Sequence, residues 1–202
     1  MNHLKNIPLS IPYKEIYARL GYSVHKTSLQ KSEKDRIDAI IRDGFSLCNF
    51  QGIYKQVKVL SVTQKGFVLE SGHEIESVYL KDKLKEYGSM IMMAASAGRI
   101  VTETVTELMK KGDNGRAVIY DATASESADA VLDYLQKHIK MQFARSGMAI
   151  SRLRYSPGYG DIDLSVQKII YDILELQDYG IILTEYFQLI PEKSVLAIAG
   201  LS

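Results

Sequence analysis

One short run of the sequence combines a permanent cation with a tight turn and two tyrosines. It extends from Arg154 to Asp161 and reads Arg-Tyr-Ser-Pro-Gly-Tyr-Gly-Asp. The arginine guanidinium is planar, stays charged at any working pH, and can donate two parallel hydrogen bonds to a carboxylate or phosphate. Pro157 fixes its own φ and Gly158 can adopt a positive φ, so the pair favours a turn whose backbone N–H groups can approach a ligand. The run predicts a small-anion site; the alternative is an ordinary surface turn, for which Pro-Gly is also common.

The other reactive residue types form no catalytic pattern. The four histidines, His3, His25, His73 and His138, are scattered without metal-ligand spacing, and the single cysteine has no Cys-x-x-Cys partner. No serine lies in a Gly-x-Ser-x-Gly motif. We therefore expect no catalytic residue and no metal site, and a binding protein whose ligand or partner supplies any reactive centre.

Composition predicts one ordinary globular domain over residues 1–202, with 46% hydrophobic and 24% charged residues. Lys and Arg total 25 against 24 Asp and Glu, so the net charge of +1 gives no reason to expect nucleic acid or an anionic membrane as partner. No segment approaches the roughly 18 apolar residues of a membrane span. Cys48 belongs to an apolar helical stripe, which suggests a buried thiol, and a single cysteine fits a reducing, cytoplasmic setting.

The periodicity of apolar residues predicts a mixture of helices and strands. Helices are expected at about 32–48, 77–87, 98–111, 125–143 and 165–180, a hairpin over 53–69, and strands at 90–95, 181–189 and 194–199. The strand at 90–95 is continuously apolar, which is typical of a strand buried on both faces. This order of elements favours an α+β fold around a largely antiparallel sheet over a regular βαβ arrangement.

The helix expected at 125–143 carries acidic residues on its polar side. Asp133 and Lys137 are spaced for an outward-facing ion pair one turn apart. Asp129 has no such partner, and a lone helical aspartate is usually a solvated surface charge. Residue types alone therefore give Asp129 no role.

The C-terminal part of the chain resembles a known family. The run from Arg154 through Ser156-Pro157-Gly158-Tyr159-Gly160-Asp161 is followed by Leu183-Thr184-Glu185-x-Phe187 and Ser194-Val195. It is preceded by the expected helix that contains Ala128-Asp129. These motifs are similar to those of the activation domain of cobalamin-dependent methionine synthase, especially its free-standing versions. The resemblance is strong over residues 128–199. Over residues 1–127 it rests on element order and on Leu20-Gly21-Tyr22.

The resemblance implies a twisted antiparallel sheet flanked by helices that binds S-adenosylmethionine. Arg154 would take the ligand's carboxylate or a nearby anionic group, and Asp129 would lie near its amino group or sulfonium, where an anion is favourable. Ser156, Pro157 and Gly158 would form the ligand-binding turn, and Tyr159 would face the corrin.

The family's role also implies partners. Cobalamin would be supplied by a methionine synthase or another corrinoid protein, and a reductant such as flavodoxin would reduce inactive cob(II)alamin before methyl transfer. The protein would position the sulfonium methyl, a proximity effect. We therefore expect a reactivation protein that acts in trans, an accessory component rather than a self-sufficient methyltransferase.

Two departures keep an alternative open. The sequence has no Trp, so the Asp-Trp-Pro segment that opens the domain in the long enzymes has no counterpart, and Ser202 falls short of a tyrosine that contacts their ligand. We expect either a site completed by a partner or, as the alternative, a non-catalytic scaffold protein that keeps the fold without the ligand.

Overall fold

The computed structural model describes residues 1–22 and 30–202, so His25 lies outside the described residues. The strands are β1 (Asn2–Lys5), β2 (Gln51–Val62), β3 (Gly66–Leu69), β4 (Glu74–Glu76), β5 (Ser89–Ser96), β6 (Ile182–Leu183), β7 (Leu189–Ile190) and β8 (Ser194–Leu201). The helices are α1 (Tyr13–Arg19), α2 (Lys31–Ser46), α3 (Val78–Leu84), α4 (Arg99–Lys110), α5 (Asn114–Ala144), α6 (Val166–Ile173) and the 3-10 helix η1 (Leu176–Tyr179).

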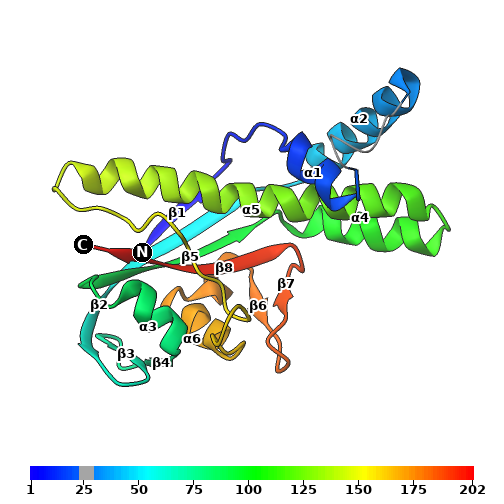
Figure 1. Cartoon of the computed structure of the whole chain (residues 1–202). Helices are drawn as coiled ribbons and strands as arrows, with labels where there is room; N and C mark the ends of the chain where they lie inside the picture. Colours follow the sequence, from blue (N-terminus) through cyan, green and yellow to red (C-terminus); the bar gives the residue numbers. More distant parts are fainter. Residues whose placement is uncertain (23–29) are drawn as a thin grey trace.

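The main sheet is antiparallel and has the order β4-β3-β2-β5-β8, with β1 paired to the first part of β2. Helix α5 crosses one face of this sheet, and α3 and α6 cover the other (Figure 1). The first half of α5 extends beyond the sheet beside α4, and α1 and α2 pack over it. The expected α+β class, with a largely antiparallel sheet flanked by helices, is confirmed.

Strand β5 lies at the centre of two hydrophobic cores. Successive side chains of a strand point to opposite faces. The side chains of Met90, Met92 and Ala94 accordingly join the core under α3 and α6. Those of Ile91, Met93 and Ala95 join the core under α5. All eight residues of β5 are buried, so its unbroken apolar run is explained by burial on both faces.

Helix α5 lies close to the sheet because small residues face it. A Cβ added at Gly52 would lie 2.7 Å from the nearer Cδ of Leu135, and Leu135 is fully buried. Ala197 and Ala199 of β8 and Ala128 of α5 belong to the same core. Small side chains on both surfaces let the helix approach the strands directly.

Several boundaries differ from the sequence prediction. Helix α5 begins at Asn114 rather than near 125, and the side chain of Asp113 caps it by accepting a hydrogen bond from the Arg116 amide at 3.3 Å. Helix α2 begins one residue before Ser32, and α1 was not predicted.

The C-terminal elements also differ. The helix after Ser165 ends at Ile173, and η1 continues the chain to Gly180. The strand expected at 181–189 is reduced to the short β6, which pairs with β7, whereas β8 pairs with β5.

The sequence predicted a buried Cys48 thiol and no membrane-spanning segment. Cys48 is partly buried, and desolvation raises the pKa of its thiol to about 12. Among the helices of the described residues, none combines the length and the apolar composition needed to cross a membrane.

Candidate functional site

The segment between α5 and α6, residues 145–165, is called the returning chain below. The side chain of Arg154 connects it to α5. Its Nη2 atom lies 3.0 Å from Oδ1 of Asp129. Its Nη1 atom contacts Oδ1 of Asp133 and lies 3.4 Å from Oε1 of Gln136. These three residues lie on consecutive turns of one face of α5, because residues three and four apart are neighbours on a helix surface. The predicted outward pair of Asp133 with Lys137 is replaced by the pair with Arg154.

The cation in this cluster is more buried than the anions. The side chain of Arg154 is 19% exposed, whereas those of Asp129 and Asp133 are 57% and 58% exposed. Burial alone would lower the pKa of Arg154, but the hydrogen bonds and charges of the two aspartates outweigh it and hold the pKa above its ordinary value. The guanidinium is therefore permanently charged, and both carboxylates remain accessible to a ligand from solvent.

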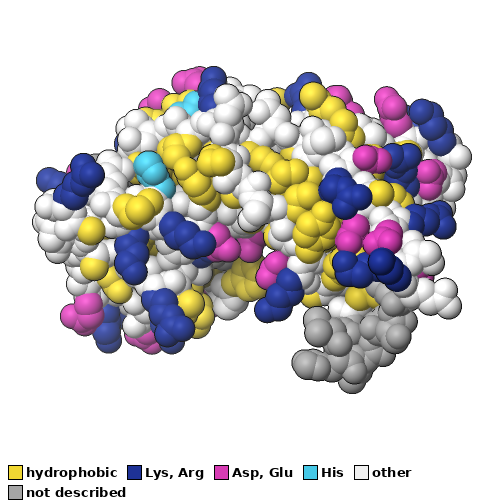
Figure 2. All heavy atoms as spheres, turned by 90° about the horizontal axis from the view of Figure 1, so that it is seen from above, with side chains coloured by type: hydrophobic (Ala, Val, Ile, Leu, Met, Phe, Trp, Pro, Cys, Tyr) yellow, Lys and Arg dark blue, Asp and Glu magenta, His cyan; other side chains and the backbone are white. Residues whose placement is uncertain are grey.

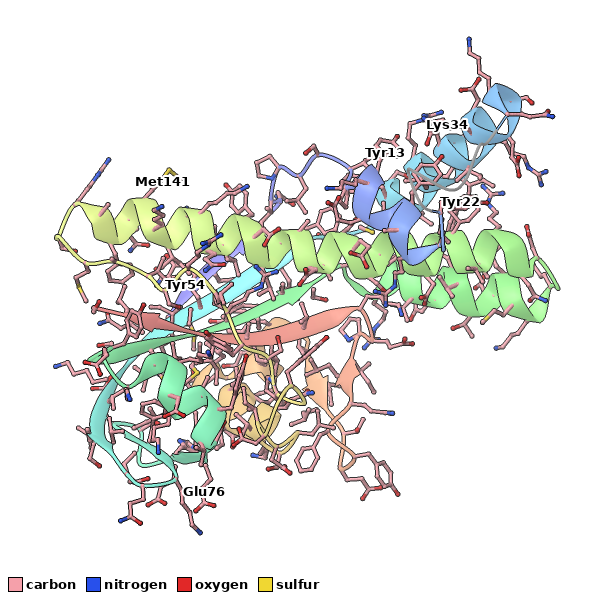
Figure 3. The ribbon with its side chains drawn as sticks, in the orientation of Figure 1. Tyr13, Tyr22, Lys34, Tyr54, Glu76 and Met141 are labelled. Atoms are coloured by element: carbon pink, nitrogen blue, oxygen red, sulfur yellow. The ribbon has the colours of Figure 1, made fainter. Side chains whose placement is uncertain are left out.

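The two aspartates line a groove between α5 and the N-terminal segment. The groove has a volume of about 600 Å³. One wall is formed by residues 8–15, including Ile11 and Tyr13, and the other by α5. Figure 3 shows Tyr13 on α1, beside α5. Aromatic and aliphatic side chains thus lie next to carboxylates, a combination typical of small-molecule sites.

Among the described residues, none of the predicted turn lines this groove, and Arg154 borders it only through its contacts with Asp129 and Asp133. Pro157 is buried, while Ser156 is half-buried and Tyr159 is 72% exposed. Gly158 has a φ of 90°, which favours glycine. The N–H of Gly158 donates to the carbonyl of Ile162 at 2.8 Å, and the N–H of Tyr159 donates to that of Ser156 at 3.3 Å. These two amides are therefore used within the turn.

Asp161, at the end of the same run, has a structural function. Its carboxylate accepts hydrogen bonds from the Ser77 hydroxyl and from the amides of Val78 and Tyr79, at 2.9 Å for Val78. The hydrogen bond from Ser77, together with those from the two amides, lowers its pKa. Asp161 thus anchors the turn to the start of α3.

The structure brings together only part of the predicted site. Arg154 and Asp129, which the resemblance assigned to different groups of the ligand, are in direct contact. Among the described residues that line the groove, Asp129 is present, whereas Arg154 and Tyr159 are not. Sequence reasoning missed Asp133 and the segment 8–15. The signal for Asp133 was present, since it lies one turn after Asp129 on the same helix.

Fold and site together define an α+β domain with an arginine-aspartate cluster at the edge of a groove. Residues 76–200 match the family described as the vitamin B12 dependent methionine synthase activation domain. The chain belongs to this family.

A similar solved structure is the crystal structure of the MetH reactivation domain bound to AdoHcy. The two share 14% sequence identity with a TM-score of 0.68, over 98% of this chain and 77% of the other. This likeness extends the shared fold to the N-terminal elements that the family match leaves out. Comparison with curated proteins gives no match.

Proposed function

We propose that this protein binds S-adenosylmethionine in the groove between α5 and residues 8–15, and that it reactivates a cobalamin-dependent methionine synthase or another corrinoid protein in trans. Membership of the activation-domain family supports the general role. The AdoHcy bound to the structural neighbour supports a ligand of the same chemical class.

The observation that carries the proposal is the contact of one arginine with two aspartates at the groove. The amino-acid end of S-adenosylmethionine has a carboxylate and an ammonium group, which complement a guanidinium and a carboxylate respectively. The carboxylates of Asp129 and Asp133 are more than half exposed. The ligand's ammonium can therefore pair with one aspartate while its carboxylate takes the freed donor of Arg154.

The groove also fits the size and character of the ligand. Its volume of about 600 Å³ lies within the roughly 300–1,000 Å³ of small-molecule sites. Tyr13 and Tyr134 on opposite walls offer rings for an adenine or ribose. When bound, the ligand supplies the sulfonium methyl group. The residues of this chain bind and orient it, and the sequence pattern indicates no side chain that would act as a nucleophile.

Cobalamin belongs to the partner in this proposal. Tyr159 is largely exposed on the turn beyond Arg154, and we assign it to the surface that faces the partner's corrin. Ser156, Pro157 and Gly158 connect Tyr159 to Arg154 in the sequence. In this proposal they complete the ligand-binding turn, and a partner that meets Tyr159 is close in sequence to the arginine-aspartate cluster.

The test is titration calorimetry of the protein with S-adenosylmethionine, repeated with Arg154→Ala. We expect binding by the wild type and a loss of affinity of about tenfold or more in the variant, because a charge-assisted bidentate contact is removed. Lys193→Ala is the matched control. Lys193 is also a partly buried cation held by acidic groups, Asp121 and Glu192, but these do not line the groove, whereas the aspartates held by Arg154 do. Equal affinity of wild type and Arg154→Ala would refute the assignment. Absence of binding by the wild type, alone and with a cob(II)alamin protein, would favour the scaffold alternative.

A further inference from the structure

The charge of the chain is unevenly distributed although its sum is close to zero. No Asp or Glu occurs between Tyr134 and Gly160, in a chain with 24 acidic residues. Arg154, in the same stretch, is neutralised by two aspartates. Four further cations occur there, and we call them the basic end: Lys137, Lys140, Arg145 and Arg152.

The fold gathers these cations at one end of α5. A hollow of about 560 Å³ lies between the end of α5 and the returning chain, and Lys137, Lys140 and Arg152 line it. A second hollow of about 550 Å³, lined by Arg145, lies between α5 and strand β1. Among the described residues, Asp133 is the only carboxylate in either lining, and it is already bound to Arg154.

The cations of the basic end are free to meet a partner. All four are exposed, and within residues 1–22 and 30–202 none of them forms an ion pair. Two large apolar side chains are next to these cations in the sequence: Met141 follows Lys140 and is 67% exposed, and Leu153 follows Arg152 and is 59% exposed. Met141 projects from α5 away from the sheet (Figure 3). Seen from the α5 side, basic and apolar side chains are interspersed on the left-hand part of the surface (Figure 2).

We propose that the basic end docks an acidic surface of the protein that carries the cobalamin. The proposal rests on the function proposed above, because Asp133 borders both the groove and the basic end, so a partner held there is brought to the ligand. Complementary charge steers such an encounter and fixes its orientation. A protein fits better than nucleic acid, since exposed Met and Leu suit an apolar contact, whereas a nucleic-acid site needs many phosphate contacts or stacking rings.

The experiment measures the affinity of the protein for a cobalamin-dependent methionine synthase that lacks its own activation domain, purified in the cob(II)alamin form. Wild type is compared with Lys140→Glu/Arg152→Glu. The matched control is Lys110→Glu/Lys111→Glu, which changes the net charge equally at the far end of α4 (Figure 1). We expect the first variant to bind at least about tenfold more weakly than wild type and the control to bind within about twofold. The affinity of wild type is also expected to fall as salt is raised from 50 to 500 mM, because screening weakens contacts between exposed charges.

Calorimetry with S-adenosylmethionine, done on the same variants, separates this proposal from the previous one. Unchanged affinity for the cobalamin protein after Lys140→Glu/Arg152→Glu, or no complex at low salt with S-adenosylmethionine binding intact, overturns the docking proposal alone. Absence of S-adenosylmethionine binding, with docking that still depends on the basic end, overturns only the ligand assignment. Tighter binding of a DNA or RNA duplex than of the cobalamin protein would also overturn the docking proposal, in favour of a nucleic-acid surface.

Discussion

Asp161 stabilises the fold, although it belongs to the run from Arg154 to Asp161 that predicts a binding site. Its pKa is lowered by the hydrogen bond from the Ser77 hydroxyl and by the amides at the start of α3. A carboxylate with a lowered pKa stabilises the folded state fully above its unfolded pKa of about 3.8, and this contribution is lost as the pH falls through the lower, folded pKa.

We therefore expect Asp161→Asn to lower the Tm at pH 7 and to approach the wild-type Tm at the acid end of the range, below the folded pKa. Thermal unfolding followed by circular dichroism from pH 7 to pH 2 measures this, with Asp82→Asn on the exposed side of α3 as a control of equal charge. A Tm difference that stays constant over the whole range would contradict the role given to the charged form.

At the residue scale, the sequence predicted some residues of the candidate site and missed the contacts of others. Arg154 could be singled out from its chemistry, but its pairing with Asp129 joins residues 25 positions apart in sequence. That contact depends on how the chain returns across α5, which residue types do not reveal. Asp129 was therefore assigned only through the resemblance to the family, and Asp133 was assigned to the wrong partner.

At the scale of elements, the sequence predicted well those helices and strands whose residue pattern follows from local burial. The strand at β5 was found because burial on both faces leaves a continuous apolar run. The first half of α5 was missed because Asn114 and Gly115 are typical of turns. Contacts of α5 with α2 and α4 stabilise this segment as helix. The partner of β8 is β5, a long-range pairing that local propensity cannot specify.

The close packing of α5 on the sheet leads to a prediction for Gly52. Its alanine variant would place a methyl group 2.7 Å from Leu135, whose side chain is fully buried and has little room to move. We expect Gly52→Ala to lower the free energy of unfolding by about 1–3 kcal/mol, as overpacking in a core does. Urea unfolding measures it, and Gly88→Ala is the control, since no atom lies within 4 Å of a Cβ added there. Equal stability of the two variants would show that α5 is free to shift.

At the scale of the whole molecule, the proposed ligand site is assembled from segments far apart in sequence. Residues 8–15 form one wall, α5 forms the other, and Arg154 reaches α5 from the returning chain. The unfolded chain does not bring these segments together, so a ligand that binds them should bind only the folded state. Such binding stabilises a protein in proportion to the logarithm of the ligand concentration.

At about 100 times its Kd, S-adenosylmethionine should add about 2.7 kcal/mol to the free energy of unfolding. For a chain of this size we expect this to raise the Tm by about 5–10 °C. Differential scanning fluorimetry measures the shift, with methionine and adenosine as separate controls that each occupy only part of the groove. Arg154→Ala should show a clearly smaller shift at the same ligand concentration. A full shift in that variant would place the ligand away from the arginine-aspartate cluster, whatever the family of the chain.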